Sequence, residues 1–245
     1  MDGTKARYVR YRSVRSRSAI AIDRVSTPEA LVRSLRRQVL EGAIPVGAHL
    51  AEVELAEVHG VSRQSMRSAL AELVHMGLLQ RAPHRGVWVP ILSARQLRDL
   101  FWVRTMVERE AVRSAMDREA DWTAVERAVH AIGALTEASS WADAVEADLG
   151  FHRALVATAD SPHLIRIHEL LMGELSLSLA GNLNDEEPGF MRGEHERLLD
   201  AFRLGDQDAA VAMLEAHLQE GLAIGTRLRL VGEEFSEGPS EEEPG

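Results

Sequence analysis

The sequence predicts a mainly α-helical protein: an N-terminal winged helix-turn-helix with a small β-hairpin wing, then a C-terminal antiparallel all-α bundle of about six or seven helices. Three observations lead to this prediction. A short helix, a glycine turn and a second helix follow one another between Leu55 and Leu79. Two short strand-like runs come directly afterwards, and apolar residues then recur at helical spacing. The expected domains are therefore residues 27–90 and residues 91–231.

The turn is the part of the helix-turn-helix that the sequence predicts most directly. Gly60 is able to adopt the left-handed conformation that ends a helix. Ser62 has a hydroxyl that can accept a hydrogen bond from the free backbone N–H groups of the next helix. The second helix is therefore expected to begin near Arg63.

The second helix has an apolar face and a polar end. The apolar positions recur at three- and four-residue steps and are Met66, Leu70, Leu73 and Val74. This pattern turns Arg63, Gln64 and Arg67 outward, near the N-terminal end that a recognition helix presents to the major groove. Arginine can bond guanine there and glutamine can pair with adenine, so these three are the expected base contacts. Ser62 and Ser65 are expected to bind phosphates.

The flanking sequence extends this pattern to a winged domain. Ser26–Glu29 has the form of a capping box with proline in the first turn, which predicts a helix from Pro28 to Glu41 that ends at Gly42. Downstream, residues 78–81 and 87–89 resemble two strands of a hairpin. The tip of this hairpin is basic and includes His84, Arg85 and Gly86.

The region from Ala30 to Pro90 resembles the GntR superfamily of bacterial transcription regulators. The matching runs are GAIPVG (42–47), LA (55–56), GVSR (60–63), RSAL (67–70) and GLL (77–79). The sequence departs from the family pattern at Val46, at Ser65-Met66 and at Ser68. The resemblance implies DNA contacts by Arg63, Gln64, Ser65 and Arg67 from the helix, and by Arg85 and Gly86 from the wing.

Charge is distributed unevenly along the chain. Residues 1–90 contain 14 Lys and Arg against 8 acids, a net charge of +6, whereas residues 91–245 contain 14 against 30, a net charge of −16. A basic N-terminal part on an acidic chain is expected where only one domain must attract a polyanion. Residues 1–26 are basic and are expected to be flexible, and two interpretations remain open: an arm that contacts phosphates, or a disordered tail.

The remainder of the chain is expected to be one helical domain. The helical patterns cover residues 97–116, 122–135, 141–159, 163–180, 190–204 and 208–230. Glycine or proline lies between most of them, and no strand-like alternation competes. Residues 232–245 contain six acids, no base and two prolines, so this acidic tail is expected to be disordered.

A second chemical signal lies inside the helical domain. Asp148 and His152 are four residues apart and therefore lie on the same face of one helix. His195 lies near the start of the fifth predicted helix and His217 in the middle of the sixth, so these two neighbouring helices could each add an imidazole. Three histidines and one carboxylate suit Zn²⁺, Ni²⁺ or Mn²⁺ better than Mg²⁺ or Ca²⁺.

These positions also resemble the FadR C-terminal domain, the ligand-sensing half of one GntR subfamily. The matching stretches are ADLGFH (147–152), GEHE (193–196) and MLEAHL (213–218), with an Arg104 that precedes Glu108 by one turn. The resemblance implies that Asp148, His152, His195 and His217 bind one divalent transition metal ion per chain. Zn²⁺ is the expected ion, with Ni²⁺ and Mn²⁺ as alternatives.

The expected ligand of the helical domain is a small carboxylate. Such an anion can displace water from open coordination positions of the metal. Arg104 is the candidate partner for a second carboxylate oxygen; the alternative is a surface ion pair with Glu108. His168 is expected at the polar surface and Trp102 in the core.

Together these features predict a regulator that is not an enzyme. We expect a cytoplasmic homodimer that binds a palindromic double-stranded operator, acts as a repressor and changes its DNA affinity when the effector binds. The alternatives are a metal-dependent hydrolase-like enzyme and a regulator whose metal is purely structural. The chain contains no cysteine, which excludes thiolate sites, and no apolar run approaches a membrane-spanning length.

Overall fold

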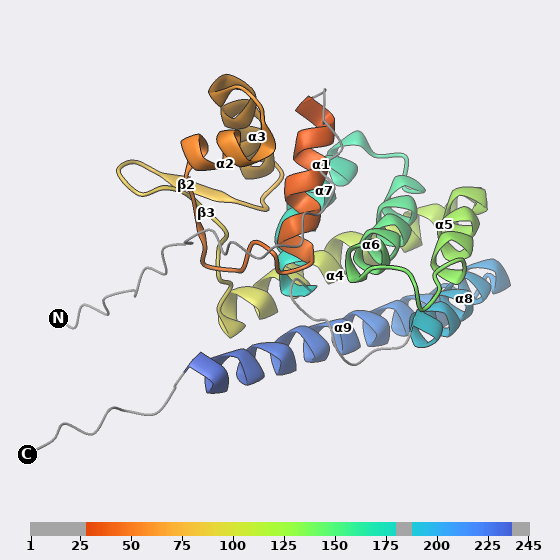
Figure 1. Ribbon diagram of the computed structural model, residues 1–245. Helices are drawn as coiled ribbons and strands as arrows, with labels where there is room; N and C mark the ends of the chain where they lie inside the picture. Colours follow the sequence, from red (N-terminus) through yellow and green to blue (C-terminus); the bar gives the residue numbers. More distant parts are fainter. Residues whose placement is uncertain (1–27, 180–187, 237–245) are drawn as a thin grey trace, which may run out of the picture. The chain divides into compact units, whose positions relative to one another are not determined.

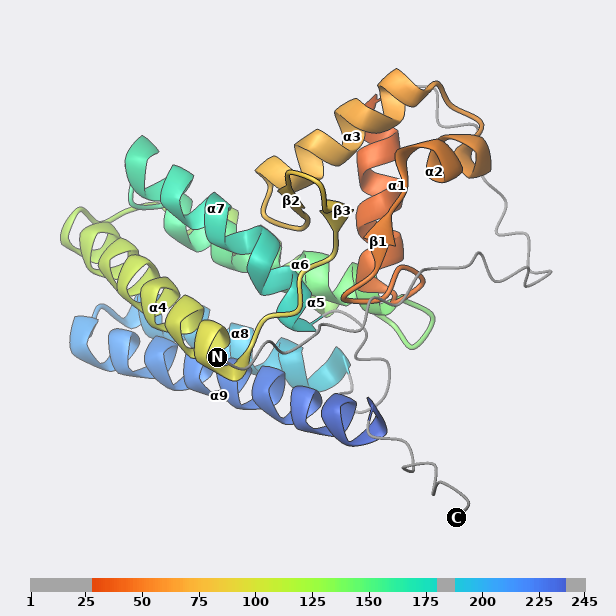
Figure 2. The ribbon, with the colours of Figure 1, turned by 90° about the vertical axis from the view of Figure 1, so that its left-hand side faces the viewer.

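The computed structural model describes residues 28–179 and 188–236 (Figures 1 and 2). The predicted basic arm of residues 1–26 and the tail from residue 237 lie outside the described residues. The described chain is mainly helical, as predicted, with one small sheet in its N-terminal part.

The N-terminal part contains three helices and three short strands. Its elements are α1 (Pro28–Leu40), β1 (His49–Leu50), α2 (Glu52–His59), α3 (Arg63–His75), β2 (Gln80–Ala82) and β3 (Gly86–Trp88). Helices α1 and α2 both pack against α3. The core side chains between them are almost fully buried and include Leu31, Leu35, Met66, Leu70 and Leu73.

The turn between α2 and α3 has the predicted geometry. Gly60 ends α2 with a φ of 63°, in the left-handed region that glycine adopts at little cost. Ser62 caps α3, since its Oγ accepts a hydrogen bond of 3.0 Å from the backbone N–H of Ser65. The prediction that α3 begins at Arg63 is therefore confirmed.

The sheet has one strand more than the predicted hairpin. Its strand order is β1-β3-β2 and both pairs are antiparallel, with Leu50 opposite Val87 and Arg81 opposite Val87 on the other side. Strand β1 is two residues long, too short to show the period of a strand in the sequence. It joins the wing to the segment before α2, which gives β3 a partner on each side.

The C-terminal part is helical throughout its described residues. Its helices are α4 (Ala94–Asp117), α5 (Thr123–Gly133), α6 (Trp141–Ala157), α7 (Pro162–Leu179), α8 (Pro188–Leu204) and α9 (Gln207–Ser236). Helix α4 packs lengthwise along α9, α5 packs against α8, and α8 against α9 (Figure 2). Helix α9 continues to Ser236, past the expected start of the acidic tail at Gly232.

The described residues form two compact units. The first unit contains the residues up to Ile91 together with Ala138–Leu149 and the part of α7 from Glu169, and the rest form the second unit. Within the first unit, Arg36 of α1 forms an ion pair of 2.6 Å with Glu146 of α6. Helices α6 and α7 each contribute to both units, because the division falls inside them.

Two further predictions concern single features. Trp102, which was expected in the core, is 62% exposed on α4, so that prediction is wrong. None of the helices in the described part of the chain has the length and hydropathy needed to cross a membrane.

Candidate functional site

Helix α6 supplies the first pair of candidate metal ligands. Asp148 and His152 are four residues apart on this helix, so their side chains leave the same face one turn apart. His152 is fully buried. A carboxylate and an imidazole therefore start from adjacent positions on one rigid element.

Helices α8 and α9 supply the other two imidazoles. His195 of α8 is buried and His217 of α9 is partly buried. One ligand atom from each of Asp148, His152, His195 and His217 lies within 4.8 Å of the others. The structure thus brings together the four residues that the sequence predicted as one site, from three separate helices.

The imidazole rings are packed closely. The rings of His152 and His217 are stacked with centroids 5.3 Å apart, and their Nε2 atoms are 3.3 Å apart. The ring of His195 meets that of His217 edge-on at 4.8 Å. Phe151 contacts His195 with its ring centroid 4.5 Å away, which gives the cluster an apolar wall.

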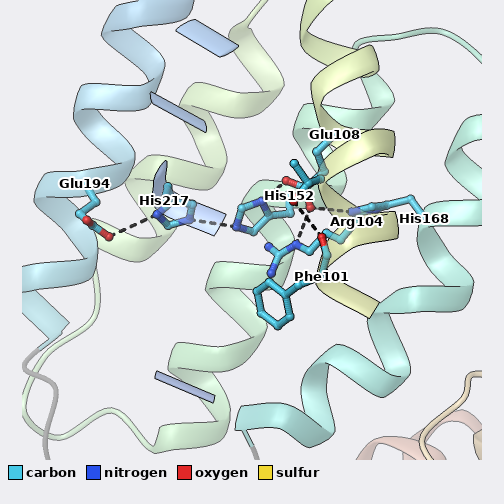
Figure 3. Close-up of polar contacts among 8 residues, drawn as sticks. Phe101, Arg104, Glu108, His152, His168, Glu194 and His217 are labelled. Carbon is cyan, nitrogen blue, oxygen red and sulfur yellow. Dashed lines mark hydrogen bonds and ion pairs between the residues drawn. The ribbon is translucent and has the colours of Figure 1, made fainter. Parts of the chain in front are cut away.

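A buried carboxylate lies behind His152. Glu108 of α4 accepts hydrogen bonds from Nδ1 of His152 at 2.7 Å, Nε2 of His168 at 3.1 Å and Nε of Arg104 at 2.6 Å (Figure 3). Burial alone would raise the pKa of Glu108. The charge of Arg104 and the two histidine contacts outweigh burial and hold this pKa well below its usual range.

A second carboxylate lies behind His217. Nδ1 of His217 is 3.2 Å from Oε2 of Glu194, one residue before His195 on α8 (Figure 3). The hydrogen bond from His217 lowers the pKa of Glu194, against the opposing effect of burial. Each of the two stacked imidazoles therefore has a carboxylate on its outer side.

One prediction about this region is wrong, and one alternative is right about the partner but not about its exposure. His168 was expected at a polar surface but is buried against Glu108. The ion pair of Arg104 with Glu108 is also buried, not on the surface, and the guanidinium lies 5.3 Å from the ring of Phe101. A signal for this burial was present, because Arg104 and Glu108 continue the apolar stripe of α4 formed by Leu97, Phe101, Val107 and Ala111.

The chemistry of the donor set fits a transition metal ion. Three imidazole nitrogens and one carboxylate oxygen are the ligands that Zn²⁺ and related ions accept, whereas Mg²⁺ and Ca²⁺ prefer oxygen alone. The separation of these atoms leaves them close enough to share one ion. Such an ion would supply a positive charge and open positions for an anionic ligand.

The candidate DNA-contacting residues of α3 lie on its solvent side. Ser62, Arg63, Gln64 and Arg67 are exposed, and Ser65 is half-buried. Ser62 Oγ lies 2.8 Å from Ser65 Oγ, so these two hydroxyls also contact each other. Arg67 donates from Nε to Glu52 of α2 at 3.0 Å, and Arg81 of β2 reaches the other oxygen of this carboxylate at 3.3 Å.

The candidate wing residues form the tip of the β2–β3 hairpin. His84, Arg85 and Gly86 are exposed, and His84 and Gly86 have positive φ angles of 63° and 73°. The guanidinium of Arg85 lies 5.2 Å from the ring centroid of Trp88, a cation–π contact. The wing therefore presents a stacked arginine at the end of a tight turn.

Two family profiles match the chain and together cover most of it. Residues 27–89 match the profile described as "Bacterial regulatory proteins, gntR family", and residues 99–220 match the FCD domain. The second match contains all four candidate metal ligands together with Arg104 and Glu108.

Individual proteins are similar to this chain over most of its length. The HTH-type transcriptional repressor RspR of Escherichia coli is 29% identical over 217 residues, which cover 87% of this chain and 94% of RspR. A probable D-xylose utilization operon transcriptional repressor of Paenarthrobacter nicotinovorans is 28% identical over 74% of this chain and 80% of its own. The solved structure of E. coli McbR/YncC has the same fold, with a TM-score of 0.68 and 24% identity over 82% of this chain and 98% of its own.

Proposed function

Because the chain belongs to the GntR family of bacterial regulatory proteins, with an FCD domain as its C-terminal half, we propose that it is a ligand-responsive repressor of transcription. In this proposal it works in the cytoplasm as a homodimer and binds a palindromic double-stranded operator. A small carboxylate bound at a metal ion in the helical domain changes its affinity for that operator. The observation that carries the proposal is the convergence of three histidines and one aspartate from three helices.

The recognition helix supports the DNA-binding half of the proposal. Arg63 and Gln64 are exposed in the first turn of α3, directly after the cap formed by Ser62. A recognition helix contacts base edges from this end, where the free backbone N–H groups also favour phosphate. Arg63, Gln64 and Arg67 are therefore the proposed base contacts. The proposed contacts to the DNA backbone come from Ser62, Ser65 and the wing residues His84, Arg85 and Gly86.

The metal cluster supports the effector half. Asp148, His152, His195 and His217 would hold one divalent ion, with Zn²⁺ as the first choice on its donor set and Ni²⁺ or Mn²⁺ as alternatives. Arg104 lies beside His152 (Figure 3) and is the proposed partner of the second oxygen of an effector carboxylate. Its Nε is already held by Glu108, which fixes the orientation of the guanidinium.

Helix α6 connects the two halves of the proposal. Glu146 on this helix is paired with Arg36 of α1 in the winged domain, and Asp148 lies two residues further along. A rise of 1.5 Å per residue places these two positions about 3 Å apart along the helix axis. A shift of α6 on effector binding would therefore act directly on α1.

A thermal-shift panel tests the effector half. Metal-loaded protein is screened against mono-, di- and tricarboxylates, sugar acids and fatty acids, and the screen is repeated after chelation. A ligand at a hundred times its Kd adds about 2.7 kcal/mol to stability, which is readily measured. We expect a carboxylate that stabilises the loaded protein and has no effect after chelation. Stabilisation that survives chelation would assign the metal a structural role, and turnover of a ligand would favour an enzyme.

A further inference from the structure

We propose that Glu108 and Glu194 are positioning residues that present Nε2 of His152 and of His217 to the metal ion. The inference rests on the metal site of the proposed function and adds the residues that orient its ligands. Neither carboxylate is among the four grouped ligand residues. Each instead contacts the ring nitrogen of one ligand that faces away from the cluster (Figure 3).

The hydrogen bond to Glu108 determines the tautomer of His152. Oε2 of Glu108 lies 2.7 Å from Nδ1 of His152. Glu108 also accepts a hydrogen bond of 2.6 Å from Nε of the positively charged Arg104, and a carboxylate in such a pair only accepts hydrogen bonds, so Nδ1 of His152 carries the proton. In a neutral ring the remaining nitrogen, Nε2, then has a lone pair available for a metal.

His217 has the same arrangement from the opposite side. Its Nδ1 lies 3.2 Å from Oε2 of Glu194, and its Nε2 lies 3.3 Å from Nε2 of His152. With both Nδ1 atoms acting as donors, two lone pairs face each other at that distance. Two lone pairs repel, whereas a cation between the rings satisfies both, so the outer carboxylates make this point a cation site.

The two carboxylates differ in how firmly they are held. Glu108 is fully buried and also binds Arg104 of α4 and His168 of α7, so it joins three helices around the site. Glu194 has a side chain that is 17% exposed. Glu108 therefore contributes both to the fold and to the site, whereas Glu194 is expected to act mainly on His217.

A carboxylate behind a metal-bound imidazole fixes the ring orientation and makes the ligating nitrogen more basic. Loss of such a partner typically weakens metal binding by about 10- to 100-fold. An effect of this size is expected here without any change in the ligands themselves. Glutamine keeps an oxygen acceptor but loses the charge, so it should cost less than alanine.

The Zn²⁺ dissociation constant, measured by competition with a chelator, tests this role. We expect E194A to weaken Zn²⁺ binding by about 10- to 100-fold and E194Q to weaken it less. E196Q is the matched control, since Glu196 is exposed on the same helix, and its Zn²⁺ affinity should equal that of the wild type. E108Q is also expected to weaken Zn²⁺ binding, and its matched control is E110Q, because Glu110 is exposed on α4.

The ¹⁵N chemical shifts of the histidine ring nitrogens report their protonation and metal binding, and they do not depend on the stability of the protein. In the Zn²⁺-loaded wild type we expect protonated Nδ1 and metal-bound Nε2 for both His152 and His217. Because this measurement uses the wild type, it also tests the role of Glu108 if E108Q fails to fold. Zn²⁺ bound through Nδ1 of either ring, or wild-type affinity in E194A, would overturn the inference. A wild-type chain that does not bind Zn²⁺ at all would overturn the proposed metal site and this inference with it.

Discussion

The surface of the recognition helix and the interior of the helical domain each contain an acid between basic groups, but in opposite surroundings. On the surface, Glu52 binds Arg67 and Arg81, and all three side chains retain contact with solvent. In the interior, Glu108 binds Arg104, His152 and His168 with almost no exposure. The same residue types can therefore exchange partners in the first region and are fixed in the second.

This difference follows from desolvation. Exposed ion pairs contribute about 0–1 kcal/mol, because water competes for both partners. Removal of one partner from a buried pair leaves an unpaired charge in a low dielectric and costs about 3–5 kcal/mol. A surface that binds DNA has to release its arginines, whereas a ligand-binding site has to hold its donors in place before the ligand arrives.

The largest expected effect is at Glu108. We expect Glu108→Ala to lower the free energy of unfolding by about 3–5 kcal/mol, because Arg104 would remain buried without its carboxylate. Urea denaturation measures this loss. Glu110→Ala, an exposed position on the same helix, should change stability by less than about 0.5 kcal/mol. Equal effects at both positions would remove the contrast between the interior and the surface.

The next effect concerns the metal ligands. We expect His217→Ala to fold but to lose the stabilisation that Zn²⁺ gives the wild type, about 2.7 kcal/mol at a hundred times the Kd. Thermal unfolding with and without Zn²⁺ measures this difference. His130→Ala, at an exposed histidine of α5, should retain the full response. An unfolded His217→Ala protein would point instead to a structural metal.

Arg63 tests the recognition surface itself. We expect Arg63→Ala to weaken binding to the specific DNA site by about 1–3 kcal/mol and binding to random DNA much less, since it contacts base edges. Fluorescence anisotropy at fixed salt measures both affinities. Arg127→Ala, on the exposed side of α5, should leave them unchanged. Equal losses on specific and random DNA would make Arg63 a phosphate contact.

A smaller effect is expected at the cap of α3. Ser62→Ala removes the acceptor of the Ser65 backbone N–H and should lower stability by about 1 kcal/mol. Denaturation of the variant measures the loss, with Ser68→Ala as an exposed control inside the same helix. No difference between the two variants would mean that water caps the helix equally well.

The smallest effect is expected at Glu52. Glu52→Gln should change stability by less than about 1 kcal/mol, because its ion pairs are exposed. The variant also loses a negative charge beside the proposed DNA contacts, so its affinity for random DNA should increase. Binding measured over a range of salt concentrations tests this. A large loss of stability would show that the surface cluster resembles the buried one.

The predictions from sequence succeeded where the relevant geometry is local. The left-handed Gly60, the Ser62 cap and the one-turn spacing of Asp148 and His152 depend only on neighbouring residues. His195 and His217 were placed by resemblance to the family, and the structure brings them to the same point.

The predictions failed where contacts between segments far apart in the sequence determine the structure. Strand β1 forms because Leu50 pairs with Val87, and a strand of two residues is too short to be predicted from its own sequence. His168 is buried because it contacts Glu108 on another helix, and the spacing of apolar residues along one helix cannot reveal a partner on another. Trp102 is exposed because the buried stripe of α4 runs through Phe101 and Arg104 instead.

The central claim is that a ligand at the metal site changes affinity for DNA. The direct test is fluorescence anisotropy of Zn²⁺-loaded protein on a DNA site selected from a random pool, at fixed salt, with and without the carboxylate identified by thermal shift. We predict a change in affinity of about 5- to 150-fold for the wild type and none for His217→Ala. An unchanged affinity in the wild type, with the carboxylate demonstrably bound, would contradict the claim.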